Sequence, residues 1–70
     1  MAEVRAHITG TVWKIEVKVG ESVSSGQVVA ILESMKMEMP VEAEDAGTVK
    51  EIRVKEGQPV AEGDIIAILG

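Results

Sequence analysis

Short aliphatic runs separated by glycine-containing turns make up most of this 70-residue sequence. Residues 11–19 are rich in β-branched side chains, and Val17 and Val19 alternate with charged neighbours, as in a strand with one wet face. Four further runs are candidate strands, at residues 28–32, 38–42, 48–55 and 64–69. We find no long segment with a helical period, so the many short strands and glycine turns predict an all-β sandwich or barrel.

The same pattern occurs twice along the chain. When the sequence is shifted by 37 residues, 12 of the 24 pairs between residues 10–33 and 47–70 are identical, including a Gly-Thr-Val triplet in each half. Each half also has a glycine-bracketed turn segment, and in the second of these Pro59 is expected outside the strands because it lacks an N–H. Stacked repeat folds need three or more units. Two similar halves therefore predict one domain over residues 1–70 with a pseudo-twofold axis.

The segment that joins the two halves contains the one loop without a counterpart. Residues 28–32 lead in as a strand and residues 38–42 lead out, so Met35 and Lys36 are expected at the tip of a tight hairpin. Two-residue hairpin loops usually contain Asn-Gly or Asp-Gly, and this loop has neither. Something other than turn propensity therefore fixes its residues. Methionines exposed on both sides of Lys36, at Met35 and Met37, make this lysine a candidate for covalent modification, with an ordinary solvated loop lysine as the alternative.

Metal and catalytic sites find little support in the same segment. Methionines at positions 35, 37 and 39 have the alternation of thioether ligands for Cu(I), but no second cluster completes a site, and a strand that packs methionines on the core has the same spacing. The acidic residues at 42, 44 and 45 fit a solvated face better than a shaped divalent-metal site. His7 has no orienting partner for nucleophilic catalysis. We therefore expect neither a metal site nor catalytic residues.

Composition excludes several kinds of partner. The chain has one Trp and no Phe or Tyr, which leaves almost nothing on which nucleic-acid bases could stack. Its formal net charge of −5, from 12 acidic and 7 basic residues, repels phosphate backbones and anionic lipid. We therefore expect no nucleic-acid and no membrane partner.

The length of the chain and its amino-terminal residues limit the activities and the cellular locations that we expect. A chain this small builds one compact core but no deep cleft between domains, which disfavours an enzyme with its own substrate pocket. The absence of Cys excludes disulfides and thiolate sites. The first residues lack the apolar core of a signal peptide, and no run approaches the roughly 20 residues of a membrane helix, so a cytoplasmic location is expected.

Residues 33–38, Glu-Ser-Met-Lys-Met-Glu, closely resemble the attachment loop of biotinyl domains, the carrier modules of biotin-dependent carboxylases and decarboxylases. The aliphatic run before them, Pro40-Val41 after them and most of the remaining chain share the resemblance. It implies a flattened barrel of two four-stranded antiparallel sheets related by a pseudo-twofold axis, a barrel-sandwich hybrid. Lys36 would lie at a hairpin tip, with the chain termini near each other at the opposite end.

The resemblance also implies a function. Lys36 would be the residue to which a biotin protein ligase attaches biotin, and Met35 and Met37 the flanking residues that this ligase recognises. The chain would then be a carrier subunit and not an enzyme. As a swinging arm it would shuttle a carboxyl group between biotin carboxylase and carboxyltransferase components.

The residues before the methionine depart from the biotin pattern. Ser34 stands where biotin carriers often have Ala, and Glu33 followed by a small hydroxyl residue is similar to lipoyl domains, which share the fold. Lipoyl domains, however, usually carry Asp where this chain has Met35. We therefore assign Glu33 and Ser34 to ligase selectivity. Lipoate, attached by a lipoate ligase in place of biotin or in addition to it, remains an alternative, and an unmodified β-barrel that serves as an interaction module is a second.

Overall fold

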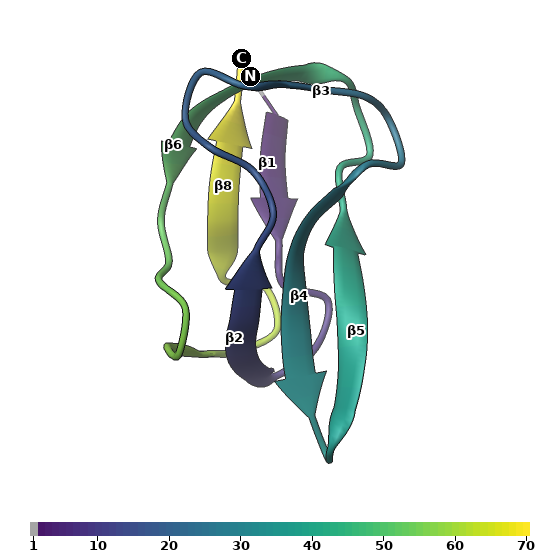
Figure 1. Ribbon diagram of the computed structural model, residues 1–70, viewed down its shortest axis with the longest axis vertical. Coiled ribbons are helices and arrows are strands. Elements are labelled where there is room, and N and C mark those ends of the chain that lie inside the picture. The colour runs from purple at the N-terminus through teal and green to yellow at the C-terminus, as the bar shows by residue number, and fades with distance from the viewer. Residues whose placement is uncertain (1) are drawn as a thin grey trace.

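The computed structural model describes residues 2–70, which form β-strands joined by turns and loops (Figure 1). The strands are β1 (Ala2–Arg5), β2 (Gly10–Ile15), β3 (Ser22–Val23), β4 (Val28–Ser34), β5 (Met37–Glu42), β6 (Gly47–Ile52), β7 (Pro59–Val60) and β8 (Ile65–Leu69). Within these residues there is no helix of the length and apolarity needed to cross a membrane.

The strands form two four-stranded antiparallel sheets, in the orders β1-β8-β6-β3 and β5-β4-β2-β7. This confirms the predicted all-β architecture. A shift of 37 residues carries β1 onto β5, β4 onto β8, β2 onto β6 and β3 onto β7, so the two sheets have the same strand order. The short strands β3 and β7 each join the sheet built mainly from the other half. Neither half therefore has a complete sheet by itself.

The core between the sheets obeys the same symmetry. Sixteen buried aliphatic residues form its central cluster, and every one has a partner 37 positions away that also belongs to the cluster. In all but one of these pairs the two residues are of the same type, because identical inner faces fill identical halves of one interior. The pairs are Val4/Val41, Ala6/Ala43, Val12/Val49, Val17/Val54, Val23/Val60, Val29/Ile66, Ala30/Ala67 and Leu32/Leu69.

The two long strands predicted from β-branched runs end earlier than expected. The run at residues 11–19 is a strand only as far as Ile15, and the run at 48–55 only as far as Ile52. One more backbone hydrogen bond follows in each half, from the Glu16 N–H to the Val29 carbonyl oxygen and from the Arg53 N–H to the Ile66 carbonyl oxygen. Past the end of each strand, Val17 and its counterpart Val54 still reach the core. Their alternation with charged residues comes from core packing and not from strand pairing, which a period of two cannot distinguish.

The prediction for Pro59 was wrong. Pro59 is the first residue of β7 and pairs with Thr11 of β2. Because β7 is the edge strand of its sheet, the missing N–H does not interrupt a ladder on both sides.

The β4–β5 hairpin and the two ends of the chain lie at opposite ends of the molecule (Figure 1). Ala2 pairs with Leu69, so the first and last strands are neighbours, as the family resemblance implied. Under the 37-residue shift these two strands correspond to β5 and β4. The hairpin thus occupies, in one half, the place that the chain ends occupy in the other, and it extends along the 31 Å axis of the molecule.

Candidate functional site

The turn of the β4–β5 hairpin consists of only two residues, Met35 and Lys36. Ser34 pairs with Met37 directly below the turn, and pairing continues down both strands to Val28 and its partner on β5. This confirms the predicted hairpin tip. β4 and β5 position the turn because six residue pairs join them, more than join any other two strands of residues 2–70.

Both turn residues have left-handed backbones. The φ angles are 53° at Met35 and 63° at Lys36, and no other non-glycine residue of the described chain has a positive φ. Positive φ at both central residues is typical of a type I′ turn, whose twist matches that of the flanking strands. For residues with a Cβ this conformation costs about 1–2 kcal/mol each. The pairing of the flanking strands must offset that free energy. Met35 and Lys36 are not residue types that favour such a turn.

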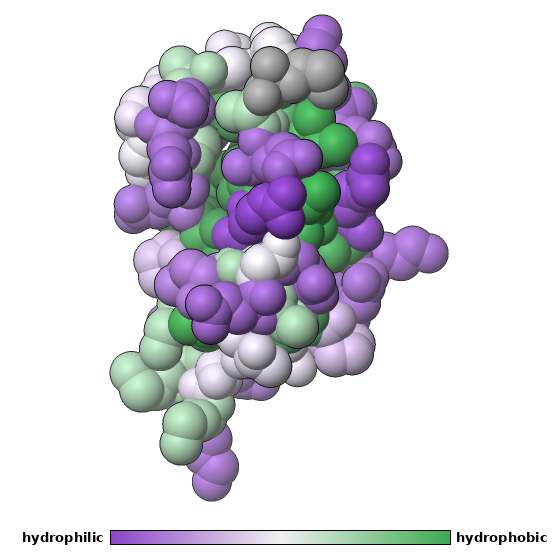
Figure 2. All heavy atoms as spheres, turned by 180° about the vertical axis from the view of Figure 1, so that it is seen from behind, coloured by the Kyte–Doolittle hydropathy of each residue, from purple (hydrophilic) through white to green (hydrophobic). Residues whose placement is uncertain are grey.

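The side chains of the turn extend into solvent. Met35 is 91% exposed and Met37 is 58% exposed, and Lys36 between them is also exposed. Figure 2 shows pale-green, moderately apolar side chains gathered over this end of the molecule, with a hydrophilic side chain extending beyond them. No hydrogen bond or ion pair ties down the Lys36 amine within residues 2–70. An accessible, uncommitted amine on a fixed backbone is what covalent attachment of a prosthetic group requires.

The residues just below the turn include one that the sequence reasoning missed. Glu33 is exposed and Ser34 is half-buried. Glu33 lies directly opposite Glu38 on β5. Like charges in directly opposed positions destabilise a sheet, so this pair is a second local cost beside the turn. Glu33 lies two residues before the turn and Glu38 two residues after it. That they face each other follows only once the register of the hairpin is known.

A glycine supports the base of the hairpin, and it too was missed as a site residue. A Cβ on Gly10 would lie 2.5 Å from the carbonyl oxygen of Glu33, so β2 approaches β4 more closely than any side chain permits. The signal was present in the sequence, as the glycine of the repeated Gly-Thr-Val triplet. Its spatial partner could not be inferred from the triplet alone.

Of the three methionines at positions 35, 37 and 39, only Met39 is partly buried. Along β5, Val41 is buried, Met39 is half-buried and Met37 is exposed. The three side chains continue one face of the strand from the core out to the tip. Over residues 2–70, no group of three or more His, Cys, Asp or Glu side chains is placed to hold a metal ion.

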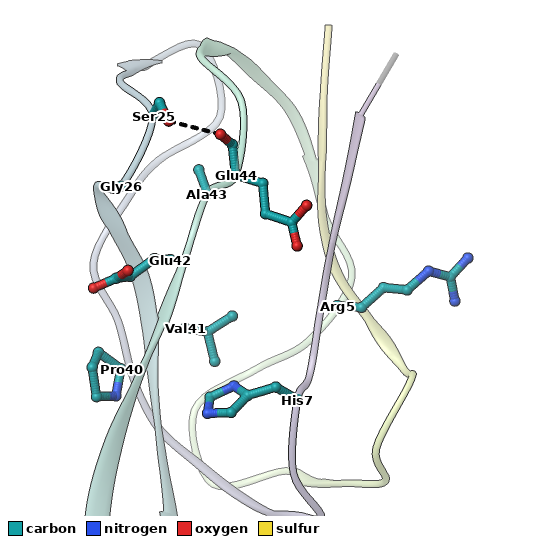
Figure 3. A pocket seen from close by; sticks show the side chains of 9 residues that line it. All are labelled: Arg5, His7, Ser25, Gly26, Pro40, Val41, Glu42, Ala43 and Glu44. Atoms are coloured by element: carbon teal, nitrogen blue, oxygen red, sulfur yellow. Dashed lines mark hydrogen bonds between the residues drawn. The ribbon is translucent and has the colours of Figure 1, made fainter.

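An open groove lies elsewhere on the surface, between β1 and β5. Figure 3 shows His7 and Val41 pointing toward each other across it, whereas Pro40 and Glu42 point away from β1. The Ser25 hydroxyl donates a hydrogen bond of 2.7 Å to the backbone carbonyl of Glu44. Among the described residues 2–70, that hydroxyl is hydrogen-bonded to this backbone carbonyl and not to a side-chain base.

Replacement of Met35 by Asn is expected to raise the free energy of unfolding by about 0.5–1 kcal/mol, because Asn tolerates the left-handed conformation better than Met. Almost no packing is lost, since Met35 is 91% exposed. Urea denaturation measures the change. The matched control is Met37→Asn, at an exposed strand position with an ordinary backbone, which should not stabilise the fold. Equal or lower stability for Met35→Asn would contradict a strained turn.

Comparison with known proteins agrees with this geometry. A family model described as "Biotin-requiring enzyme" matches residues 1–69. The chain is 51% identical over 41 residues to the Biotin/lipoyl attachment protein of Bacillus subtilis, which covers 59% of this chain and 56% of that protein. It is 52% identical over 44 residues to Biotinylated protein TB7.3 of Mycobacterium tuberculosis, covering 61% of this chain and 62% of that protein.

Among solved structures, the urea carboxylase of Kluyveromyces lactis contains a region that matches 99% of this chain with a TM-score of 0.92 and 38% sequence identity, over 6% of the carboxylase chain. The alignments with the two curated relatives span less than two thirds of either protein. The family model, by contrast, extends over almost every residue. The chain therefore belongs to the biotin/lipoyl attachment family.

Proposed function

We propose that this protein carries covalently bound biotin on Lys36 and that it is a carrier, not an enzyme. The observation that supports this most strongly is the position of Lys36, at the left-handed tip of the β4–β5 hairpin, with an exposed side chain. The names of the relatives support biotin as the attached group, since one is called a biotinylated protein and another a carboxylase.

Attachment requires an acyl transfer to the Lys36 side chain. The Nζ atom attacks the carbonyl carbon of a biotinyl-adenylate, an amide bond forms, the acyl–phosphate bond breaks and AMP leaves. A lysine amine is protonated near neutral pH and must first lose a proton. We assign that step to the biotin protein ligase, because no carboxylate of residues 2–70 is hydrogen-bonded to this amine. The carrier contributes a rigid hairpin, which lowers the entropy lost when the lysine enters the ligase.

The residues beside Lys36 have separate roles in this proposal. Met35 and Met37 are the apolar contacts through which the ligase recognises the tip, and their exposure supports such a contact. Glu33 and Ser34 lie at the end of β4 and tune the selectivity between ligases. No residue of the chain has a catalytic role.

When attached, biotin carries a carboxyl group between the active sites of partner enzymes. The part of this chain is to hold the attachment point rigidly and to raise the local concentration of the attached group. We propose a biotin carboxylase and a carboxyltransferase as these partners, supported by the matching region within a urea carboxylase. Because the ligase consumes ATP, we place the carrier in the cytoplasm, where ATP is available.

Coexpression with a biotin protein ligase, and separately with a lipoate ligase and lipoate, tests the proposal by intact-mass measurement. We expect one biotinyl adduct, the mass of biotin less one water, on nearly every molecule in the first experiment. A lipoyl adduct alone would favour the alternative to which the name of the Bacillus relative also points. No adduct in either experiment would overturn the carrier function and leave an unmodified interaction module.

A further inference from the structure

Trp13 is the only aromatic residue of the chain apart from His7, and it lies on the surface with 45% of its area exposed. Val12 pairs with Leu32 and Lys14 pairs with Ile31, so Trp13 is the extra residue of a β-bulge in β2. Val12 and Leu32 are fully buried and face the core. The bulge therefore directs Trp13 to the outer face of the sheet that carries the hairpin.

Apolar side chains adjoin Trp13 on this outer face. Ile31, opposite the bulge on β4, pairs on its other side with Pro40 of the edge strand β5. We call Trp13, Ile31 and Pro40 the Trp13 patch. Figure 3 shows Pro40 and Glu42 on the same side of β5, pointing away from β1. The patch thus runs across three neighbouring strands of one sheet.

Acidic side chains border the patch on β4 and β5. Glu33 and Glu38 oppose each other between the patch and the tip, and Glu42 lies on the far side of Pro40. Lys14 makes a cation–π contact within the patch, with its Nζ 5.7 Å from the centre of the Trp13 ring. A partner for this face must therefore offer an apolar surface with basic groups around it.

The pseudo-twofold symmetry supplies an internal reference for the patch. Shifted by 37 residues, Trp13 corresponds to Lys50 and Pro40 to Glu3, both exposed on the outer face of the other sheet, while Ile31 corresponds to Ile68. The bulge recurs there, between Val49 and Glu51. The same backbone accepts a lysine where the hairpin-bearing sheet has tryptophan, so the fold does not need an aromatic residue here. An exposed cation–π contact with Lys14 adds only weakly to stability.

We propose that the Trp13 patch is a second contact surface for the biotin protein ligase, which holds it in an apolar pocket rimmed by lysine and arginine. The inference rests on the function proposed above. A ligase that binds ATP and an acyl-adenylate needs basic groups around its active site, and the acidic border of the patch complements them. Trp is also the residue type most often found at the energetic centre of a protein interface.

A second contact solves a recognition problem that the symmetry creates. The two sheets of this domain share one strand order and the same bulge, and the chain has other exposed lysines, such as Lys14 and Lys50. Ile31 precedes Lys36 by five residues, which places the patch roughly 17 Å behind the tip along the strand. A ligase that grips both the tip and the patch can bind the hairpin-bearing sheet in only one orientation.

Steady-state biotinylation, followed by intact mass with a purified biotin protein ligase, tests the assignment. For Trp13→Lys, which installs the residue of the symmetry-related position, we expect kcat/KM to fall roughly ten-fold or more through a raised KM, with kcat nearly unchanged. Trp13→Gln removes the ring without adding a charge, and its kcat/KM should fall in the same way. Trp13→Phe should recover most of the activity.

The matched control is Lys50→Ala on the other sheet, which should leave KM unchanged. Thermal melts of all variants establish that each is folded. Unchanged KM for Trp13→Lys and Trp13→Gln, with wild type still biotinylated, would overturn the patch but leave the carrier function intact. An equal loss of kcat/KM for Lys50→Ala would also overturn the proposal. Substitutions on either sheet would then slow biotinylation, and the effect could not be assigned to the Trp13 patch. If the wild-type protein is not biotinylated, the proposed carrier function is wrong, and the contact surface that rests on it is wrong with it.

Direct contact has its own readout, because Trp13 is the chain's one tryptophan. The Lys36→Arg carrier, labelled at Trp13 with 5-hydroxytryptophan, can be excited selectively in a mixture with the ligase and biotinyl-adenylate. We expect the label to become protected from acrylamide quenching in the complex. Full quenching in the presence of saturating ligase would contradict burial of the patch.

Discussion

Replacement of Lys36 by Arg is expected to abolish the covalent adduct completely. Arginine keeps the positive charge and the length of the side chain, but its guanidinium stays protonated in proteins and offers no nucleophilic amine. Coexpression with the ligase followed by intact-mass measurement gives the result. The free energy of unfolding should stay within about 0.5 kcal/mol of wild type, because the changed side chain is exposed and makes no contact that the fold requires.

Lys50→Arg is the matched control for this variant, at an exposed lysine of the other half. It should be modified to the same extent as wild type. An adduct that persists in Lys36→Arg would show that another lysine is the acceptor. Peptide mapping of the modified wild-type protein would then identify that lysine, and the role given to the hairpin would have to be abandoned.

Gly10→Ala is expected to destabilise the fold by about 1–3 kcal/mol, the usual cost of forcing an atom into a filled space. The new Cβ would lie 2.5 Å from the Glu33 carbonyl oxygen. This oxygen belongs to the backbone of β4 and cannot rotate away, so β2 and β4 must separate just below the hairpin. Urea denaturation measures the loss of stability, and the ligase assay should also reveal slower modification because the base of the hairpin has shifted.

The symmetry-related glycine provides the control. A Cβ on Gly47 would come within 3.2 Å of the Leu69 side chain and 3.5 Å of the Gly70 carbonyl oxygen, which small adjustments can relieve. Gly47→Ala should therefore cost less than Gly10→Ala and leave biotinylation unaffected. Equal costs for both variants would mean that the close approach at Gly10 has no special importance for the hairpin.

Two local costs meet at the hairpin tip. The left-handed backbone of Met35 and Lys36 is one, and the opposed carboxylates of Glu33 and Glu38 are the other. Strain of this kind persists where the surrounding structure over-determines it, and it is common at functional sites. Stable pairing of β4 with both β2 and β5 lets the tip keep residues that do not favour turn formation.

The site was predictable to the extent that it is local in sequence. Strand pairing on both sides of Met35 and Lys36 required a reversal there, and a two-residue loop follows from the spacing. The resemblance of residues 33–38 to the attachment loop then pointed to Lys36. Glu38 and Gly10 were missed, because their importance depends on what lies opposite them in the folded sheet.

Sequence by itself determined the all-β class, the repeated pattern, the hairpin and the choice of Lys36 as the proposed attachment residue, because each depends on residue type and on spacing along the chain. Only the tertiary structure decided where the strands end, since core packing at Val17 continues the alternation after pairing stops. It also decided what distinguishes the two similar faces. Trp13 and Lys50 occupy equivalent bulges, and only the folded sheets set the tryptophan on the same side of the molecule as the hairpin. That relation depends on register between distant strands, which no local pattern encodes.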